Sequence, residues 1–406
     1  MSFEKRNLRI LFSHYGIKDG DGFGRTFMLA RELAALGHYV TILTSQRGEF
    51  TFPLKSEARD GVEIVSFPDV VPKAMRKGGL GPLNILLKSV YVLLHQYDIV
   101  HSDSGHRPSS GIPCTVHRFF RNSIYVSEWW DYFGKGGMQD DQQWWYRAIL
   151  GTYDSWAEIH NKKIADGVIA LSEFTKGRAI DIGVPEERIL ILHGGADTRT
   201  IQYIPDRRNR KKFGIPEDSL VFGFVGINEH ELIDLEPFLR AVNSLKNFKR
   251  ISWFSTGRKL SKETTGKFGL SDEYHEFGWV DYEQYSDLLS CADVFALLSR
   301  QNLVNKARWP NKVGDYLAAG RVVLANPYGE VAHYMRESPE SFISVSWSHQ
   351  SIENAILEML DNRDEILKKG EHARRLAEER LSWKIQALSL DSFYHLIVGN
   401  EGLLHD

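Results

Sequence analysis

The sequence predicts an α/β protein made of two doubly wound domains, each with a parallel sheet. Short apolar, β-branched runs alternate with stretches of helical periodicity, which is the pattern of βαβ units rather than of a sandwich or barrel. The same alternation starts again near Val221. The chain has 406 residues, and domains usually contain about 150, so a single core is not expected.

The first βαβ unit is nearly complete at the start of the chain. Leu8–Ser13 is expected to form a buried strand, and 16–24 a glycine-rich loop. A helix is expected over Thr26–Leu36, with Gly37 following its end, and the next strand over Tyr39–Thr44.

The remaining strands are expected at similar intervals along the chain. In the first half they are Val62–Phe67, Ile99–Ser102, Ser123–Ser127, Gly167–Leu171 and Ile189–Leu192. In the second half they are Val221–Val225, Ile251–Thr256, His275–Phe277, Val294–Leu298, Val322–Ala325 and Phe342–Val345. All are rich in apolar residues, as strands buried on both faces of a parallel sheet should be.

Composition places the domain boundaries. Ile204–Lys212 contains a proline, six charged residues and no apolar run, which is typical of an exposed linker. Ser382–Val398 has helical spacing of apolar residues and therefore needs a hydrophobic surface to pack on. We expect a first domain over 1–203, a second over 204–385, and a terminal helix over 386–406 that packs back on the first.

The overall composition excludes several classes of protein. Hydrophobic residues make up 42% and charged residues 25% of the chain, values that exclude wholesale disorder, collagen-like repeats and coiled coils. The net charge of −3 gives no general attraction to nucleic acid, so we expect no nucleic-acid partner. Two cysteines, a charged start without a secretory leader and the lack of a long apolar run predict a cytoplasmic protein that does not span a membrane.

The first candidate site is the glycine-rich segment Lys18–Thr26. Its glycines Gly20, Gly22 and Gly24 follow a strand and open a helix, where backbone N–H groups and the helix dipole favour an anion. The segment is neither a G-x-G-x-x-G fingerprint nor a P-loop. The alternative is that the glycines serve only a tight turn.

An acidic pair lies inside this glycine-rich segment. Asp19 and Asp21 could hold a divalent cation, but paired carboxylates are also common in turns. We therefore expect no metal site.

The second candidate site is the stretch Trp309–Gly320. Lys312, in the first turn of an expected helix, could neutralise a phosphate, and Arg308 adds a bidentate donor. Asp315 could accept hydrogen bonds from vicinal hydroxyls such as those of a ribose. Lys312 and Asp315 could equally form a surface ion pair, and their spacing leaves both interpretations open.

Several short motifs occur in an order that resembles one enzyme family. They are Gly37–Val40 (GHYV), Asp98–His101 (DIVH), His193–Asp197 (HGGAD), Phe224–Gly226 (FVG), Phe277–Val280 (FGWV), Ala292–Phe295 (ADVF) and Pro310–Gly320. The chain thereby resembles the retaining, GT-B-fold glycosyltransferases of family 4 along nearly its whole length. The resemblance implies two Rossmann-like domains facing across a cleft, with a nucleotide-sugar donor on the second and an acceptor on the first.

The resemblance also implies roles for individual residues. Asp315 matches the carboxylate that binds the donor ribose, and Lys312 the base near the phosphates. It places the remaining implied donor or acceptor contacts in loops at Gly22 and Gly24, Gly226, Arg258 and Glu330. It implies neither a metal nor a cofactor, because basic side chains and a helix N-terminus neutralise the diphosphate.

Three positions depart from the family pattern. Ala307 stands where the first glutamate of E-x7-E is usual, and Gly226 is followed by Ile-Asn-Glu-His-Glu in place of the usual arginine and lysine. The phosphate charge must then come from Arg308, Lys306 or Lys312. Trp130 replaces the histidine of an H-D pair, which leaves Asp131 to orient an acceptor hydroxyl or the donor sugar, and the neighbouring tryptophans to form a sugar-stacking floor or simple packing.

Together these features predict a metal-independent retaining hexosyltransferase with Asp131, Arg308 and Lys312 as catalytic residues. A UDP- or GDP-sugar would be the donor, and a hydroxyl of a glycan, glycolipid or protein-linked glycan the acceptor, as in polysaccharide biosynthesis. The alternatives are a catalytically silent GT-B domain used for binding or assembly, and a nucleotide-sugar epimerase or phosphorylase.

A last hypothesis concerns peripheral contact with a membrane. The stretch Pro72–Tyr97 combines Lys73, Arg76, Lys77 and Lys88 with leucines and valines at helical spacing, as in an amphipathic surface helix. The alternative is an ordinary helix packed on the first sheet.

Overall fold

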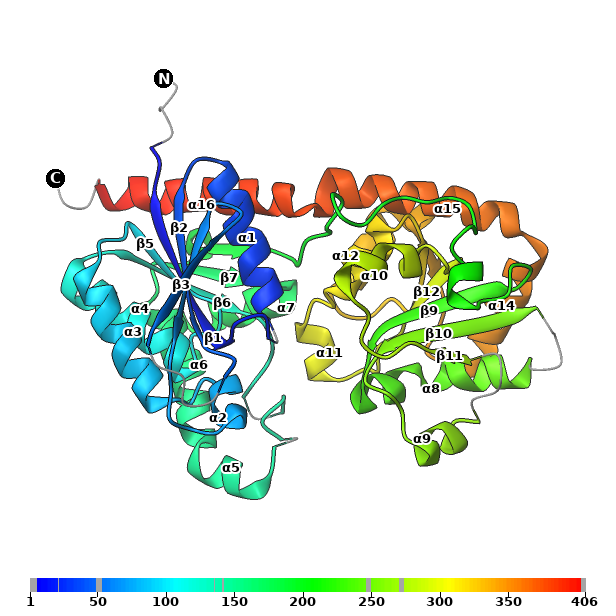
Figure 1. The fold of residues 1–406 in the computed structure, drawn as a ribbon, viewed down its shortest axis with the longest axis horizontal. Coiled ribbons are helices and arrows are strands. Elements are labelled where there is room, and N and C mark those ends of the chain that lie inside the picture. The colour runs from blue at the N-terminus through cyan, green and yellow to red at the C-terminus, as the bar shows by residue number, and fades with distance from the viewer. Residues whose placement is uncertain are drawn as a thin grey trace. The chain divides into compact units, whose positions relative to one another are not determined.

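The computed structural model describes residues 6–20, 22–48, 53–134, 136–140, 142–245, 250–269 and 274–402. The chain forms two compact units. Unit 1 comprises Met1–His193 with Trp383–Asp406, and unit 2 comprises Gly194–Ser382. In each unit helices cover both faces of one sheet, which confirms the predicted pair of Rossmann-like α/β domains (Figure 1).

The sheet of unit 1 has eight strands in the order β3-β4-β2-β1-β5-β6-β7-β8, all parallel except β3. Its interior strands are buried on both faces, since neighbouring residues such as Leu11 and Phe12 are both almost fully covered. The strands are β1 (Arg9–Ile17), β2 (Tyr39–Ser45), β3 (Lys55–Arg59), β4 (Val62–Phe67), β5 (Ile99–Ser102), β6 (Ile124–Trp129), β7 (Gly167–Ala170) and β8 (Ile189–Ile191).

The helices of unit 1 lie between these strands and at the end of the chain. They are α1 (Phe23–Ala35), α2 (Lys73–Lys77), α3 (Pro82–Leu94), α4 (Pro108–Arg121), α5 (Trp144–Ile149), α6 (Gly151–Ile164), α7 (Glu173–Asp181), the 3₁₀ turn η1 (Glu186–Arg188) and α16 (Trp383–Gly402).

The sheet of unit 2 has six parallel strands in the order β11-β10-β9-β12-β13-β14. They are β9 (Leu220–Ile227), β10 (Ile251–Gly257), β11 (Tyr274–Glu276), β12 (Val294–Leu297), β13 (Val322–Ala325) and β14 (Phe342–Ser344). The helices and helical turns are η2 (Lys211–Phe213), α8 (Glu229–Ser244), α9 (Lys262–Lys267), α10 (Tyr282–Leu289), α11 (Leu303–Ala307), α12 (Lys312–Ala318), α13 (Val331–Glu337), η3 (Pro339–Ser341), α14 (His349–Asp361), α15 (Arg363–Leu376) and η4 (Ala377–Leu381).

Every strand expected from the sequence overlaps an observed strand, but β3 was not expected. Its sequence KSEAR has no apolar alternation, and its side chains are mostly exposed at the sheet edge. Asp60 and Gly61 connect it to β4, both with positive φ (51° and 80°). That geometry is typical of a two-residue hairpin turn, so the Asp-Gly pair was the available signal.

The glycine-rich loop is shorter than expected. β1 continues to Ile17 and α1 begins at Phe23, so both flanking elements extend into 16–24. The earlier helix start follows from Gly22, whose positive φ of 77° ends the turn directly before the helix.

The units divide at His193/Gly194 and Ser382/Trp383, whereas the sequence placed the boundaries at 203/204 and 385/386. The segment after Gly194 belongs to unit 2 because the Trp309 indole N–H donates to the Gly194 carbonyl (3.1 Å). Arg374 likewise donates to the Thr198 and Ile201 carbonyls (3.0 and 2.7 Å).

The interpretation of Ile204–Lys212 as an exposed linker is wrong for Arg210. This side chain is fully buried, pairs with Asp293 (2.7 Å), and donates to the carbonyls of Cys291 and Ser219. It therefore anchors the segment to unit 2.

Two of the four basic residues assigned to the amphipathic face of Pro72–Tyr97 are also buried. Arg76 donates to the carbonyls of residues 46 and 48, and Lys88 donates to those of His14 and Ser109 (2.7 and 3.2 Å). Satisfying buried carbonyls is a structural role, so neither side chain can face an anionic surface.

The terminal helix α16, red in Figure 1, packs against α1 within unit 1. Leu390 and Tyr394 are fully buried in the same hydrophobic cluster as Ile10 and Leu33. The His38 ring also contacts the Asp391 carboxylate, with Nε2 2.9 Å from Oδ1. The last helix therefore completes the core of unit 1.

We predict that Leu390→Ala lowers the free energy of unfolding of unit 1 by about 2–5 kcal/mol, because it leaves a cavity in this cluster. Leu396→Ala on the same helix is the matched control, since Leu396 is 52% exposed, and should change stability by about 0.5 kcal/mol or less. Urea unfolding of the full chain measures both. Equal free energies of unfolding for the two variants would show that α16 does not complete the core.

Candidate active site

A pocket in unit 2 lies at the carboxyl ends of β9 and β10. It has a volume of about 260 Å³ and is lined by Val225, Gly226, Thr256, Trp279, Tyr282 and Tyr285. Ligands of open α/β sheets bind beyond the carboxyl ends of the strands, so this is the expected place for one. Its walls are mostly aromatic or apolar, which suits the flat parts of a nucleotide.

Gly226 presents bare backbone to this pocket. Its φ is 69°, and a Cβ built there would meet nothing within 4 Å. Its N–H donates to Thr256 Oγ1 (3.2 Å), which fixes the loop after β9 against the end of β10. The exposed Arg258 directly follows β10, and its N–H donates to the Ile227 carbonyl (3.2 Å).

Asp315, in the first turn of α12, is held by a tyrosine from α10. The Tyr285 hydroxyl donates to Asp315 Oδ2 (2.8 Å). Burial raises the pKa of Asp315 to about 7, with the nearby Asp197 adding to the rise and the Tyr285 hydrogen bond opposing it. Tyr282, one turn earlier in α10, donates to Asp197. Two tyrosines thus hold two carboxylates beside the pocket.

Lys312, the first residue of α12, forms an ion pair with α8. Its Nζ is 3.2 Å from Glu231 Oε1 and 4.2 Å from the centre of the Phe224 ring. Burial lowers the pKa of Lys312, and Glu231 opposes that shift. The sequence alternative, an ion pair between Lys312 and Asp315, is not what the structure shows, because each side chain has another partner.

Arg308 also contacts carboxylates of α8. Its guanidinium lies 3.3 Å from Asp234 Oδ2 and 3.8 Å from Glu231 Oε1. Asp234 is in addition held by Arg300 (2.6 Å) and by the Asn305 amide. Arg300, Arg308 and Lys312 therefore face two acidic side chains of one helix, whereas Lys306, the other cation expected at the phosphates, is exposed on α11.

Sequence reasoning missed Glu231, Asp234 and Tyr285. Asn228 caps α8 by accepting the Glu231 N–H (3.0 Å), so the N-x-x-E pattern did signal the start of a helix. No local pattern could indicate that these side chains meet residues 30 to 81 positions later, because those contacts depend on how the strands are ordered in the sheet.

The loop before α13 places Glu330 close to the chain near α11. Gly329 has a φ of 64°, and a Cβ there would lie 2.5 Å from the Asn305 carbonyl, so only glycine fits. Glu330 itself is nearly buried. Ala307, at the place of the usual glutamate, is fully buried and offers no group for binding a sugar.

In unit 1, Trp130 covers the glycine loop. A Cβ on Gly22 would lie 2.4 Å from the Trp130 ring, so the indole is packed on bare backbone. Gly24, in the first turn of α1, is exposed with nothing near its Cβ position. Asp131 is partly buried and follows β6. All four residues lie at the same carboxyl edge of the first sheet, since β6 is parallel to β1 through β5.

Trp129 does not belong to a sugar-stacking floor. It is only 2% exposed, and its indole N–H donates to Glu158 Oε1 (2.7 Å). Packing, the alternative considered for the tryptophans, is therefore the correct interpretation for Trp129. Trp130 remains partly exposed, with its indole N–H on Glu128.

Glu128 lies at the centre of a buried network in unit 1. Arg25 and His101 approach its carboxylate to 3.1 and 3.2 Å. Burial alone would raise the pKa of Glu128, but Arg25 and His101 bring it down to about 2. The carboxylate beneath Trp130 is therefore ionised at neutral pH.

A second buried pair was not anticipated from the sequence. His14 Nδ1 lies 2.5 Å from Asp103 Oδ2, and the hydroxyls of Thr26 and Ser110 also donate to Asp103. His14 is fully buried. An imidazole held by a carboxylate can act as a base, but a substrate cannot reach this one in the observed conformation.

Among the described residues, His38, Asp391 and His395 form the one group of possible metal ligands close enough to share an ion. His38 Nδ1 accepts the Leu8 N–H (3.1 Å), so the proton of a neutral His38 ring is on Nε2, which faces Asp391 and has no lone pair for a metal. In the glycine loop, Asp19 pairs with Arg59 (3.1 Å), and Asp21 lies outside the described residues.

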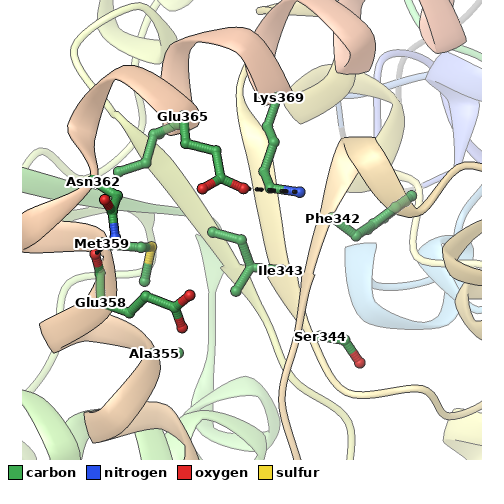
Figure 2. Close-up of a pocket in the computed structure, with 10 residues that line it drawn as sticks. Phe342, Ile343, Ser344, Ala355, Glu358, Met359, Asn362, Glu365 and Lys369 are labelled. Carbon is green, nitrogen blue, oxygen red and sulfur yellow. Dashed lines mark hydrogen bonds and ion pairs between the residues drawn. The ribbon is translucent and has the colours of Figure 1, made fainter.

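Another pocket runs along the edge strand β14, between α14 and α15, with a volume of about 230 Å³ (Figure 2). Glu358 and Glu365 line it together with Lys369, whose Nζ is 3.9 Å from Glu365. Two carboxylates against one ammonium disfavour a diphosphate. The pocket beside Gly226 is therefore the better candidate for a nucleotide.

Two family models match consecutive parts of the chain. Residues 25–200 match Glycosyltransferase Family 4, and residues 205–380 match Glycosyl transferases group 1. The chain belongs to the glycosyltransferases. No curated protein sequence matches this glycosyltransferase.

Solved structures show that the glycosyltransferase has the GT-B fold. Sucrose-phosphate synthase from Thermosynechococcus elongatus is similar with a TM-score of 0.74 and 16% identity, over 97% of this chain and 100% of that one. WaaG, a glycosyltransferase involved in lipopolysaccharide biosynthesis, has a TM-score of 0.68 and 16% identity, with 95% and 99% covered. Anabaena HepE, solved in complex with UDP-glucose, has a TM-score of 0.67 and 13% identity, with 98% and 100% covered.

The raised pKa of Asp315 predicts how the stability of the glycosyltransferase depends on pH. The pKa of an aspartate in the unfolded chain is 3.8, and that of Asp315 in the folded chain is about 7. Between these values the folded state holds a proton that the unfolded state has lost, so this group's contribution to stability falls as pH rises from about 4 to 7. Asp315→Asn removes this pH-dependent contribution, because an amide does not titrate in this range.

We therefore expect the stability of Asp315→Asn, relative to the unmodified chain, to increase between pH 4 and 7 in urea unfolding. Tyr285→Phe is the companion variant. It removes a hydrogen bond that favours the charged carboxylate, so it should raise the pKa of folded Asp315 further and extend the upper end of this pH range, while the lower end stays at the pKa of an unfolded aspartate. A difference between Asp315→Asn and the unmodified chain that is the same at every pH would rule out the titration.

Proposed function

We propose that this glycosyltransferase moves a hexose from a nucleotide-sugar donor, such as a UDP- or GDP-sugar, to a hydroxyl acceptor with retention of configuration. The observation that carries the proposal is the pocket beside Gly226, where bare backbone, a partly buried carboxylate and a partly buried ammonium lie around one strand end. The bare backbone allows the nucleotide to approach closely, the carboxylate suits the ribose hydroxyls, and the ammonium suits the diphosphate.

In this proposal different residues contact different parts of the nucleotide-sugar donor. The Asp315 carboxylate accepts hydrogen bonds from the ribose hydroxyls, which then compete with the Tyr285 hydroxyl. The backbone at Gly226 approaches the donor closely, Arg258 reaches the base, and the loop at Glu330 contacts the donor sugar. Trp279, which is 86% exposed at the pocket, supplies a face on which the base can stack.

The transfer step rests on positioning and charge. The acceptor oxygen forms a bond to the anomeric carbon on the face from which the diphosphate departs, and the bond from that carbon to the phosphate oxygen breaks. The acceptor's proton passes to the departing phosphate, so no protein nucleophile is needed. Arg308 and Lys312 stabilise the charge that develops on the diphosphate, in place of a metal ion or other cofactor.

The acceptor is proposed to bind on unit 1. Asp131 and the loop at Gly22 and Gly24 lie at the carboxyl edge of the first sheet, and Asp131 can orient an incoming hydroxyl. The ionised Glu128 is paired with Arg25 and accepts the Trp130 indole N–H, so it fixes that ring at this edge. A glycan, glycolipid or protein-linked glycan would meet these groups through its hydroxyls.

One observation favours a second candidate, a catalytically silent GT-B domain. Ala307 offers no carboxylate to a donor sugar, and Arg308 and Lys312 are already paired with acidic side chains. A panel of nucleotide sugars, assayed for transfer, hydrolysis and protection against thermal unfolding, separates the two. Turnover of one donor supports the transferase, and binding without turnover across the panel supports the silent domain.

We expect Asp315→Asn to weaken UDP binding about 5–10-fold at pH 8, because a neutral amide accepts weaker hydrogen bonds from the ribose than a carboxylate does. In the unmodified chain the same affinity should fall as pH drops below about 7, the pKa of Asp315. Calorimetric titration measures both. Glu358→Gln in the β14 pocket is the control, and if it lost UDP binding while Asp315→Asn kept it, the nucleotide site would be in the wrong place.

Peripheral membrane contact is proposed for the outer face of α3 and α4, two helices that pack together. We define the apolar face by five exposed side chains, Leu86, Val90, Leu94, Phe119 and Phe120. Lys73 and Lys77 of α2 and Arg121, the last residue of α4, are exposed basic residues of the same unit. Exposed apolar groups together with basic residues are typical of a surface that meets anionic lipid. No helix among the described residues is long and apolar enough to cross a bilayer.

We predict that Leu86→Ser with Leu94→Ser reduces co-sedimentation with vesicles containing anionic lipid by several-fold, because two exposed leucines of the apolar face are lost. Ile180→Ser on α7, where Ile180 is 41% exposed, is the matched control and should bind as before. Sedimentation of the unmodified chain that is equal with neutral and anionic vesicles would argue against the membrane surface.

A further inference from the structure

Glu231 occupies a position that an anionic ligand would normally take. It is the third residue of α8, the 16-residue helix that starts at the carboxyl end of β9. In α/β folds the N-terminus of such a helix attracts phosphate, because its N–H groups and its dipole are positive. Here Lys312 and Arg308 also converge on this point, and the anion that they contact is the Glu231 carboxylate.

The contact is sheltered from water. The Glu231 and Lys312 side chains are 13% and 15% exposed. Losing one partner of such an ion pair leaves the other charge poorly solvated. A ligand that takes Lys312 must therefore replace the carboxylate with an anion of its own.

The Asp234 carboxylate is more deeply buried than that of Glu231. Its side chain is 3% exposed and is held by Arg300, Arg308 and the Asn305 amide. Arg300, Arg308 and Lys312 together carry three positive charges, and Glu231 with Asp234 carries two negative ones. The cluster keeps one net positive charge, and it would have two without Glu231.

We propose that Glu231 is a resident anion in the donor-phosphate site, and that a nucleoside diphosphate binds by displacing its carboxylate from Lys312. The inference rests on the proposed function, because it assigns the Lys312 cluster to the donor diphosphate. The consequence is a site of lowered affinity, in which the chain's own carboxylate competes with every phosphate ligand. Removing the charge while keeping the shape of the side chain should strengthen binding.

The test is calorimetric titration of UDP into the unmodified chain, Glu231→Gln and a control variant at low ionic strength. We expect Glu231→Gln to bind UDP at least about fivefold more tightly, and the gain to shrink as salt is added. Glu236→Gln is the control, since Glu236 lies on the same helix and pairs with Arg240 (2.6 Å) away from Lys312. It should bind like the unmodified chain. Equal or weaker binding by Glu231→Gln overturns the proposal.

Pyrophosphate serves as a second probe because it has no base or ribose. The same gain with pyrophosphate assigns the effect to the phosphate site, and a gain seen with UDP alone overturns that assignment. Adding Lys312→Gln to Glu231→Gln should abolish the gain. Glu231→Ala, which keeps a good helix former at this position, replaces Glu231→Gln if the latter does not fold.

The outcomes separate this proposal from the proposed function. If the unmodified chain binds UDP and Glu231→Gln shows no gain, the resident-anion proposal is wrong and the donor site stands. If no variant binds UDP or pyrophosphate, both are wrong.

Discussion

The ion pair between Lys312 and Glu231 determines how the charged side chains at the carboxyl edge of the sheet in unit 2 are paired. A parallel sheet brings the carboxyl ends of its strands to one edge, and there the helix that follows β9 meets the helix that precedes β13. Charged side chains gathered at such an edge must find partners, because unpaired charges are costly to bury. Lys312 finds Glu231, which leaves Asp315 to the Tyr285 hydroxyl. The charged side chains of the site are thus held in place by one another.

Unit 1 also pairs a buried charge at the carboxyl edge of its sheet, here a carboxylate. Glu128, the penultimate residue of β6, is buried with Arg25 from α1 and His101 from β5. His101 in turn lies against the Tyr394 hydroxyl of α16 (2.5 Å). The terminal helix is therefore tied to the charged centre of unit 1 as well as to its apolar core.

The sequence predicted the parallel strands well, because strands buried on both faces must be continuously apolar, as in Val322–Ala325. It missed β3, an edge strand whose charged residues face water. Motif order located Lys312 and Asp315, but the partners of both side chains come from helices distant in the chain. Such contacts follow from strand order in the sheet, which no local pattern specifies. The same limit applied to Arg210, which looked like part of a solvated linker and is buried.

Hydrogen–deuterium exchange of the full chain, with and without saturating UDP, tests most directly whether the glycosyltransferase binds its donor beside Gly226. We predict slower exchange in peptides that cover 224–228, 279–285 and 310–316, which surround the pocket and Asp315. Peptides that cover β14 and α14, at the pocket of Figure 2, should be unchanged. Protection confined to β14 and α14, or no protection at 224–228 and 310–316, would contradict the assignment of the donor site.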